Sequence, residues 1–222
     1  MSVDGKIDTI ARGGAAISSP EDRARVDRLR ASVDAVLVGG RTLLAEDPAL
    51  TVKSARLRAA RTRGGQPENP AKVGVVSEIG PQDLPAGGRF LTGGPARIFI
   101  FTTRRTPAQV IRRLEAAGAV VQVAGEQRVD LRAVLGSLAA AGLRSILVEG
   151  GGTLLAEFFR LGLVDEVTVY IAPRIFGGAS APTLADGPGL GTADMPRLRL
   201  KSIKRIDPGG GVLAHYIVEA KE

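Results

Sequence analysis

The sequence predicts an α/β protein with a mostly parallel central sheet flanked by helices. Short apolar segments alternate with helical segments along most of the chain, and two of them run directly into glycines, at Gly39-Gly40 and at Gly150-Gly151-Gly152. Strand–helix alternation favours parallel strands that helices cover on both faces. Ligands of such sheets bind beyond the carboxyl ends of the strands, so both glycine turns are expected to border one ligand crevice.

The helices follow from their end signals. Ser19-Pro20, followed by Glu21 and Asp22, is a favourable start for a helix that runs to about Ser32. A hydroxyl cap, a proline in the first turn and acidic residues near the positive end of the dipole all stabilise a helix N-terminus. Further helices are expected from a Thr106-Pro107 cap to Gly118, from an Asp130 cap to Gly142, and over residues 153–161.

Strands are predicted where Val, Ile and Phe gather between stretches rich in proline and glycine. Such segments lie at residues 35–38, 72–76, 96–101, 119–123 and 145–148. The Arg, Gly and Pro content predicts loops at residues 54–71, with the arginines of residues 56–63 in solvent, and at residues 80–95.

The C-terminal part has a different pattern. Residues 164–172 form a long apolar strand, and residues 197–206 and 212–220 flank the turn sequence Asp207-Pro208-Gly209-Gly210-Gly211. Such a turn between two alternating segments is typical of a β-hairpin. We therefore expect antiparallel strands at one edge of the sheet.

Length and composition favour a single domain that covers residues 1–222. With 44% hydrophobic residues, the chain has enough apolar side chains for one substantial core. No apolar run reaches the roughly 18 residues of a membrane helix, and residues 1–10 lack a basic-then-apolar leader. We expect a cytoplasmic protein without a membrane partner.

Cysteine and histidine usage excludes several kinds of chemistry. The chain has no cysteine and a single histidine, His215. Disulfides, thiolate nucleophiles and zinc ribbons are therefore excluded, and one histidine leaves neither a His-based metal site nor a Ser-His-Asp triad. We expect no metal, and we expect a bound cofactor to supply the reactive group.

The charge balance points to a small anionic ligand. The formal net charge is +7, but aromatic residues make up only 4% of the chain, tryptophan is absent and the arginines are scattered. A nucleic-acid surface needs clustered cations and stacking side chains, so a nucleic-acid partner is not expected. A small phosphorylated ligand fits the composition better.

The strongest functional signal is the run Val148-Glu149-Gly150-Gly151-Gly152-Thr153-Leu154. Glycines let backbone N–H groups approach a ligand without interference from Cβ, and the following helix presents unpaired donors and the positive end of its dipole. This pattern predicts a phosphate cradle. The spacing is not G-x-G-x-x-G, so the ordinary dinucleotide fingerprint is absent, and a plain strand-to-helix turn is the alternative.

Four motifs in order carry a resemblance that covers essentially the whole chain. They are Ser2-Val3-Asp4-Gly5-Lys6-Ile7, the segment 30–52 with Glu46-Asp47-Pro48, the run 148–154, and residues 163–178 with Ile171-Ala172-Pro173. Together they resemble the riboflavin-biosynthesis reductase family. The resemblance implies a dihydrofolate-reductase-like fold, NADPH as cofactor, and reduction of the ribosyl side chain of a phosphoribosylamino-pyrimidine to a ribityl chain.

The resemblance points to the stand-alone form of the family. That form acts on 2,5-diamino-6-(ribosylamino)-4(3H)-pyrimidinone 5′-phosphate, whereas bacterial relatives usually carry a fused zinc deaminase. The deaminase signature requires cysteines, which this chain lacks. Two alternatives stay open: a reductase of the pterin or dihydrofolate type, and an NADPH-binding protein without turnover.

The resemblance also implies roles for individual residues. Substrate positions are Arg30, Leu50, Lys53 and Glu149, and the two cations suit a sugar phosphate. Thr103 and Arg104 follow a predicted strand and offer a hydroxyl and a cation to the 2′-phosphate of NADPH. The other cofactor positions are Gly39, Gly40, Thr42, Glu46, Ser77, Gly150, Gly151, Gly152, Thr153 and Leu154.

Glu149 and Asp47 are the candidate catalytic carboxyl groups. Hydride addition to C1 of the opened ribose requires a proton at the adjacent heteroatom, and a partly desolvated carboxyl group is suited to supply it. The structural alternatives are a strand-end carboxylate bonded to backbone for Glu149, a turn or cap residue for Asp47, and a cation that complements a helix C-terminus for Arg30.

A homodimer is expected from the C-terminal strands. The strand at residues 164–172 and the hairpin strands are apolar enough to pack on a partner, and an uncovered edge of this length invites pairing with another chain.

Overall fold

The computed structural model describes residues 1–14, 16–192 and 195–219. The chain folds into two compact units. One, here called the parallel-sheet unit, is Val26–Gly151, and the other, the terminal unit, combines Met1–Arg25 with Gly152–Glu222. The organisation of residues 1–222 as a single domain stays a prediction.

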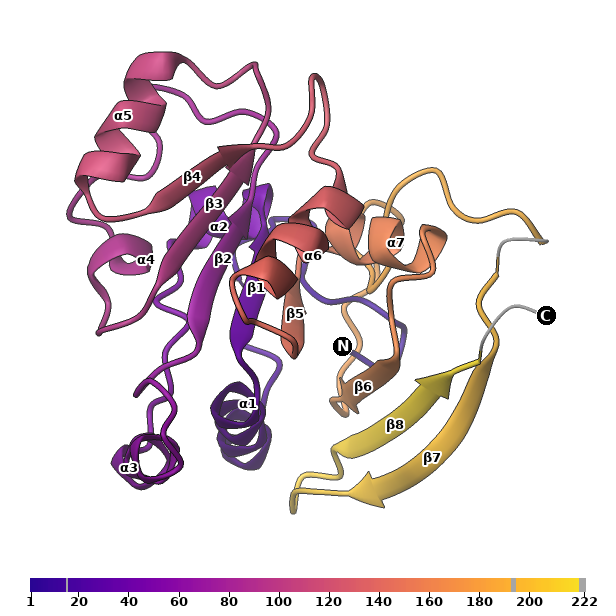
Figure 1. The fold of residues 1–222 in the computed structure, drawn as a ribbon. Helices are drawn as coiled ribbons and strands as arrows, with labels where there is room; N and C mark the ends of the chain where they lie inside the picture. The colour runs from indigo at the N-terminus through magenta and orange to yellow at the C-terminus, as the bar shows by residue number, and fades with distance from the viewer. Residues whose placement is uncertain (15, 193–194, 220–222) are drawn as a thin grey trace. The chain divides into compact units, whose positions relative to one another are not determined.

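Five parallel strands form the sheet of the parallel-sheet unit, in the order β4-β3-β2-β1-β5. Every residue of β1, β2 and β3 is buried, as expected for strands that are covered on both faces. Figure 1 shows these strands side by side. The strands are β1 (Ala35–Gly39), β2 (Ala71–Val75), β3 (Ile98–Thr102), β4 (Val120–Val123) and β5 (Ile146–Gly150), so all five predicted strands are confirmed.

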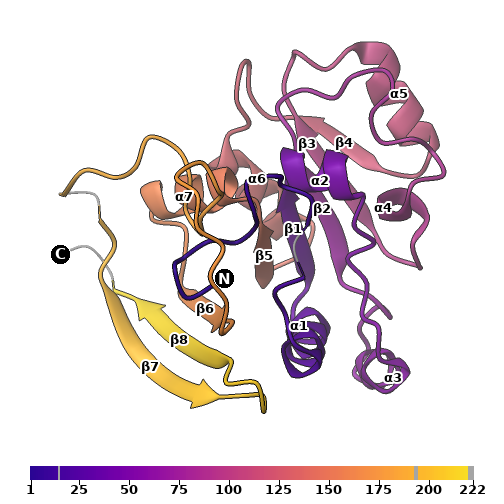
Figure 2. The same ribbon diagram turned by 180° about the vertical axis from the view of Figure 1, so that it is seen from behind.

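Helices cover both faces of this sheet. Helix α6 (Leu131–Ala140) lies in front of the sheet in Figure 1, and α2 (Gly40–Glu46) lies in front of it in Figure 2. The Asp130 side chain accepts hydrogen bonds from the backbone N–H groups of Arg132 and Ala133, which confirms the predicted cap. The remaining helices of this unit are α3 (Ala55–Arg63), α4 (Arg89–Thr92) and α5 (Ala108–Ala116), and α1 (Pro20–Ser32) begins in the terminal unit and ends here.

The core of this unit lies between the sheet and its helices. Val36 and Val38 of β1 form one buried cluster with Ile100 of β3, Phe90 of α4 and Leu114 of α5. Burial of such side chains contributes about 1.5–3 kcal/mol each and fixes the strands whose ends carry the glycine turns.

The prediction of a loop at residues 54–71 was wrong, because α3 occupies much of it. Ser54 begins the helix by accepting a hydrogen bond from the backbone N–H of Leu57. Arg61 is 4% exposed, and its guanidinium donates to the carbonyl oxygens of Pro67, Ala31 and Val33 at 2.8–2.9 Å. The arginine content misled the prediction, since this arginine is buried and bonded to backbone.

Thr106 does not cap α5, contrary to the prediction. The N-cap is Pro107, which makes no side-chain cap bond. The buried Thr106 hydroxyl instead accepts the backbone N–H of Ile79 at 3.0 Å and lies 2.6 Å from the Thr102 hydroxyl. The hydroxyl therefore joins β3 to the segment after β2. Within the predicted loop at 80–95, residues 89–92 form α4.

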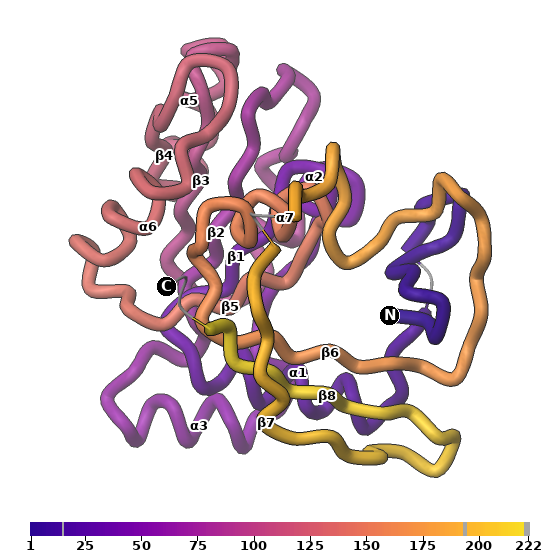
Figure 3. Tube along the Cα trace, turned by 90° about the vertical axis from the view of Figure 1, so that its right-hand side faces the viewer, coloured from indigo at the N-terminus to yellow at the C-terminus, as the bar shows by residue number. Residues whose placement is uncertain are grey.

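The terminal unit contains α7 (Gly152–Arg160) and a three-stranded antiparallel sheet, in the order β6-β8-β7. Figure 3 shows β8 (Val212–Val218) running between β6 (Glu166–Ile171) and β7 (Leu198–Arg205). The predicted hairpin is confirmed, although Ala220, its expected last residue, lies outside the described residues.

The placement of these strands at an edge of the parallel sheet was wrong. They form a separate sheet, because β8 pairs with β6 on one side and β7 on the other, and the described ladder of β5 runs to β1. In the part of the chain that the structure describes, no helix combines the length and the apolar character that crossing a bilayer requires.

Candidate active site

The carboxyl ends of four parallel strands share one edge of the sheet. Val38 lies opposite Gly150, Gly39 lies opposite Val75, and Val75 lies opposite Phe101. The chain segments that follow these strands therefore meet at this edge, as the sequence predicts. The strand ends and the segments after them carry Gly39, Gly40, Ser77, Thr103, Arg104, Gly150 and Gly151.

The glycine turn after β5 requires glycine. Gly150 and Gly151 have φ values of 141° and 22°, in a region that L side chains rarely adopt. A Cβ built on Gly150 would meet no atom within 4 Å, so open space lies before this backbone. Gly151 donates its N–H to the Thr42 hydroxyl at 3.3 Å, which joins this turn to α2.

The remaining cradle residues belong to the other unit. Gly152, Thr153 and Leu154 form the first turn of α7. Gly152 is closely packed there, because a Cβ at this position would lie 2.4 Å from the carbonyl oxygen of Thr183. Glycine is therefore required at Gly152 by packing within the terminal unit.

Arg30 and Glu149 form a bidentate ion pair. Arg30 Nε and Nη2 donate to Glu149 Oε1 and Oε2, each at 2.6 Å, and Nη1 donates to the carbonyl oxygen of Thr51 at 3.1 Å. Both side chains are 17% exposed. Burial lowers the pKa of Arg30, but the hydrogen bond and charge of Glu149, together with the charge of Asp27, outweigh it and raise the pKa above the ordinary value.

The bidentate pair accounts for both carboxylate oxygens of Glu149. Both of its oxygens accept N–H groups from one guanidinium, which is the bidentate geometry that Arg–carboxylate pairs favour. Its partner is Arg30, so the alternative of a carboxylate bonded to backbone was wrong. Both residues were predicted for the substrate site, but their pairing was not.

Asp47 caps a helix. It is the left-handed C-cap of α2, with φ 42°, and its Oδ2 and Oδ1 accept the backbone N–H groups of Arg89 and Phe90 at 2.6 and 2.8 Å. These are the first residues of α4, whose N-cap position offers no side-chain bond of its own. The structure therefore supports the cap alternative for Asp47. Glu46 is exposed, and its backbone carbonyl accepts a hydrogen bond from Arg89 Nη2 at 2.5 Å.

Lys72 is a buried cation that was not predicted from the sequence. It is fully buried on β2, and its Nζ donates to the carbonyl oxygens of Phe90 and Gly93 at 2.9 and 2.8 Å, at the C-terminal end of α4. Burial lowers the pKa of the Lys72 ammonium to about 8, against the charge of Asp47, which raises it. A lone lysine inside an apolar strand is the signal that could have found it.

The predicted substrate residues Leu50 and Lys53 lie in the irregular segment between α2 and α3. Leu50 is 2% exposed and has φ 51°, a strained value for leucine, whereas the Lys53 side chain is exposed. The backbone N–H groups of Lys53 and Ser54 donate to the two carboxylate oxygens of Asp27. Asp27 is another residue that sequence reasoning missed.

Ser77, Thr103 and Arg104 follow β2 and β3. Thr103 has no exposed surface, and its hydroxyl donates to the carbonyl oxygen of Ser77, so it holds the Ser77 turn and does not face solvent. Arg104 is exposed and pairs with Glu126, with 2.5 Å between Nε and Oε1. Of the two residues assigned to the 2′-phosphate, only Arg104 is accessible.

A cavity of about 500 Å³ lies elsewhere, within the terminal unit. It is lined by the start of α1, the end of β6 and the hairpin turn, including Arg23, Tyr170, Arg174 and Asp207. None of the predicted site residues lines it. The cavity and the glycine turns are therefore separate features.

The family described as the RibD C-terminal domain matches residues 1–211. A protein of Archaeoglobus fulgidus named 2,5-diamino-6-ribosylamino-4(3H)-pyrimidinone 5′-phosphate reductase is 40% identical over 215 residues, which are 97% of this chain and 94% of the relative. A protein of the same name from Methanothermobacter thermautotrophicus is 41% identical over 220 residues, 99% of this chain and 95% of the relative.

Solved structures show the same fold. A pyrimidine reductase-like protein of Corynebacterium diphtheriae superposes with a TM-score of 0.82 at 22% identity, over 100% of this chain and 90% of that one. RibD of Acinetobacter baumannii gives 0.78 at 24% identity, over 98% of this chain and 55% of that one. At these identities the likeness concerns the fold alone, and it confirms the predicted dihydrofolate-reductase-like class.

Proposed function

Because this chain belongs to the RibD C-terminal domain family, we propose that it is an NADPH-dependent reductase of 2,5-diamino-6-ribosylamino-4(3H)-pyrimidinone 5′-phosphate. The reaction converts the ribosyl side chain to ribityl. The observation that carries the proposal is the similarity, over almost the whole length of both chains, to two relatives that bear the name of this activity. The Arg30–Glu149 pair supplies a carboxylate that can stabilise positive charge on the substrate during hydride addition.

The glycine turns fit a dinucleotide cofactor. Gly150 borders open space but has φ 141°, which L side chains rarely adopt, and a Cβ at Gly40 would lie 3.1 Å from Val76 Cγ1, so glycine suits both positions. In the proposal, Gly39, Gly40, Thr42, Gly150 and Gly151 hold NADPH, with Glu46 and Ser77 beside them and Arg104 at the 2′-phosphate. NADPH, when bound, supplies the hydride.

The substrate phosphate is assigned to Lys53 and Arg30. Lys53 is exposed and carries a mobile point charge that suits a phosphate group. Arg30 uses three of its five N–H donors on Glu149 and Thr51, which leaves two for the ligand. Leu50 is 2% exposed and anchors this segment in the core.

Glu149 acts as an ionised group in this proposal. Hydride addition to C1 of the opened ribosylamine is easiest when the adjacent nitrogen already carries its proton, because the resulting iminium is the stronger electrophile. A carboxylate held by Arg30 stabilises that positive charge without giving up a proton. The proton then comes from water, because both Asp47 oxygens are bonded to the start of α4.

The purified chain tests the function directly. With NADPH and 2,5-diamino-6-ribosylamino-4(3H)-pyrimidinone 5′-phosphate, we expect steady oxidation of NADPH, and with dihydrofolate we expect none. Oxidation with dihydrofolate alone would favour a pterin-type reductase. Binding of NADPH without turnover of either compound would favour a binding protein.

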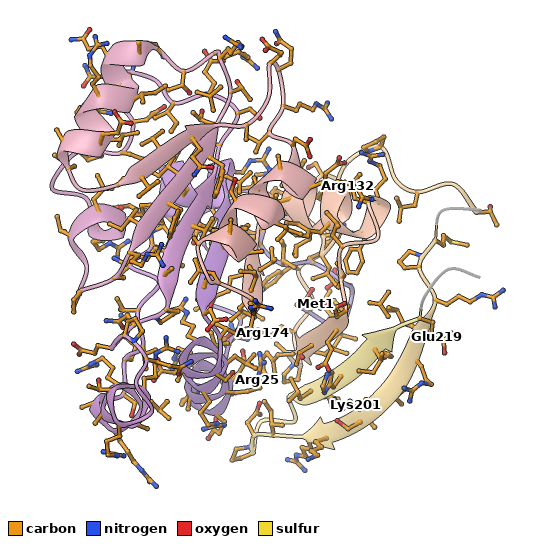
Figure 4. All side chains as sticks on the ribbon, in the orientation of Figure 1. Met1, Arg25, Arg132, Arg174, Lys201 and Glu219 are labelled. Atoms are coloured by element: carbon orange, nitrogen blue, oxygen red, sulfur yellow. The ribbon has the colours of Figure 1, made fainter. Side chains whose placement is uncertain are left out.

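We also propose a homodimer that uses β7. This edge strand exposes Leu198, Leu200 and Ile203 at 43%, 49% and 60%. Apolar side chains on an edge strand favour pairing with another chain. Lys201, labelled on β7 in Figure 4, pairs with Glu166 of the same chain at 3.4 Å.

A further inference from the structure

The segment from Thr51 to Ser54 has no regular structure, yet side chains bind its backbone at each of its four residues. Arg30 donates to the carbonyl oxygen of Thr51, and Arg58 Nη1 donates to those of Val52 and Lys53 at 3.0 and 2.7 Å. Irregular backbone that is bonded in this way is fixed before any ligand arrives.

Asp27 makes the most concentrated of these contacts. Its side chain lies on α1 and the residue is 8% exposed. Oδ1 accepts the N–H of Lys53 at 2.5 Å, and Oδ2 accepts the N–H of Ser54 at 2.8 Å. Two successive amides on one carboxylate form charge-assisted bonds, which are stronger than neutral ones.

Asn69 holds the preceding residue. It is 2% exposed, its Oδ1 accepts the N–H of Val52 at 2.9 Å, and its Nδ2 donates to the carbonyl oxygen of Pro95 at 3.2 Å. Val52 itself is buried at 1% exposure. The backbone is therefore anchored immediately before Lys53 as well as at it, while the Lys53 side chain stays in solvent.

Asp27 and Arg30 lie three residues apart on α1, so they share one helix face. One accepts the amides of Lys53 and Ser54, and the other binds the carbonyl of Thr51 and the carboxylate of Glu149. A single helical turn thus connects the segment that carries Lys53 to the carboxylate at the end of β5.

We infer that Asp27 is a positioning residue, which clamps the Lys53 and Ser54 amides and thereby fixes where the Lys53 ammonium leaves the backbone. The inference rests on the proposed function, in which that ammonium meets the substrate phosphate. Asp27 itself touches neither substrate nor cofactor, and it acts through Lys53.

Hydrogen exchange tests the clamp without any substrate. Asp27→Asn keeps one acceptor oxygen and turns an NH₂ group toward a backbone N–H, so exchange in residues 51–54 should become about ten-fold faster or more. The matched control is Asp34→Asn, because Asp34 binds the successive amides of Arg144 and Ser145 at 2.9 Å, at the opposite ends of the strands. Unchanged exchange of residues 51–54 in Asp27→Asn would overturn the inference.

Kinetics test the action through Lys53. Asp27→Asn should raise the substrate KM about ten-fold with kcat nearly unchanged, whereas Asp34→Asn should leave both near wild type. In a Lys53→Met background, Asp27→Asn should raise KM by less than about two-fold, because the group that it positions is gone. Fully additive effects, or equal changes of KM in the Asp27 and Asp34 variants, would overturn the inference.

A variant that does not fold and a wild-type chain without activity are distinguished as follows. If Asp27→Asn does not fold, Asp27→Glu keeps the charge but moves the carboxylate by one methylene from the amides of Lys53 and Ser54, and exchange and KM should change in the same direction. If the wild-type chain fails to oxidise NADPH with the pyrimidine substrate, the proposed function fails, and the exchange experiment still decides whether Asp27 clamps this segment.

Discussion

Arg30 binds Glu149 through two parallel N–H···O bonds of 2.6 Å, although the two residues are 119 positions apart in the sequence. The pair joins α1 to the end of β5, one residue before the glycine turn. Two parallel bonds of this kind hold the carboxylate in one orientation, where it can stabilise positive charge on a ligand.

Arg30→Ala should weaken substrate binding and leave NADPH affinity nearly unchanged. The change removes a charge-assisted contact and leaves Glu149 without its counter-ion, which typically costs about 1.5–3 kcal/mol, or roughly ten- to a hundred-fold. Titrations of substrate and of NADPH against the variant measure the two affinities separately. Equal losses for both ligands would remove Arg30 from the substrate site.

Glu149→Gln should lower kcat more than it raises KM. The amide keeps the shape and one acceptor oxygen but carries no negative charge, so it cannot stabilise an iminium. Single-turnover rates compare the chemical step directly, and Asp34→Asn serves as a control carboxylate remote from the glycine turns. If the variant matches the wild-type rate, Glu149 only orients the substrate.

Asp47→Ala should destabilise the protein without abolishing the reaction. Loss of the bonds to Arg89 and Phe90 removes the cap of α4, and a lost helix cap costs about 1 kcal/mol. Thermal melting should show a lower Tm, with kcat nearly unchanged. A large fall in kcat at an unchanged Tm would instead make Asp47 a catalytic residue.

Lys72 should make stability depend on pH in the alkaline range. Its pKa is lowered to about 8 from 10.5, so between these values the unfolded chain binds more protons than the folded one. Stability from this group therefore rises with pH through that window and levels off above it. Denaturant melts give the free energies of unfolding of the wild type and of Lys72→Met. The wild-type value minus the Lys72→Met value should rise from pH 8 to 10.5. A difference that is flat or falls with pH would contradict the assignment.

Light scattering should give twice the chain mass of 23.1 kDa for the wild type. Ile203→Glu places a charge in the exposed apolar row of β7 and should shift the protein toward the monomer. Lys204→Glu, which changes a neighbouring residue on the opposite side of the strand, is the control and should remain dimeric. A monomeric wild type at micromolar concentration would dismiss the dimer.

The strand positions and glycine turns were predictable because they are local patterns. Apolar runs such as residues 35–38, and the glycines that end them, report burial and turn geometry within a few residues. The helix α3 was missed because the sequence alone does not distinguish Arg61, which is buried and bonded to carbonyl groups, from an arginine in solvent.

The site was predictable in part. The resemblance named Arg30 and Glu149, but their pairing depends on how α1 packs beside β5, which no local pattern encodes. Asp27 and Lys72 bind backbone groups of distant segments, and such contacts leave no periodicity in the sequence. Long-range polar contacts of this kind are found only once the fold is known.

The fate of the transferred hydride distinguishes a reductase of this substrate from a protein that only binds NADPH. NADPH that carries deuterium at the transferable position is incubated with the protein and 2,5-diamino-6-ribosylamino-4(3H)-pyrimidinone 5′-phosphate, and the product is examined by mass spectrometry. We expect a ribityl product with one deuterium at C1 of the side chain. A chain that binds NADPH yet returns the ribosyl compound unlabelled would contradict it.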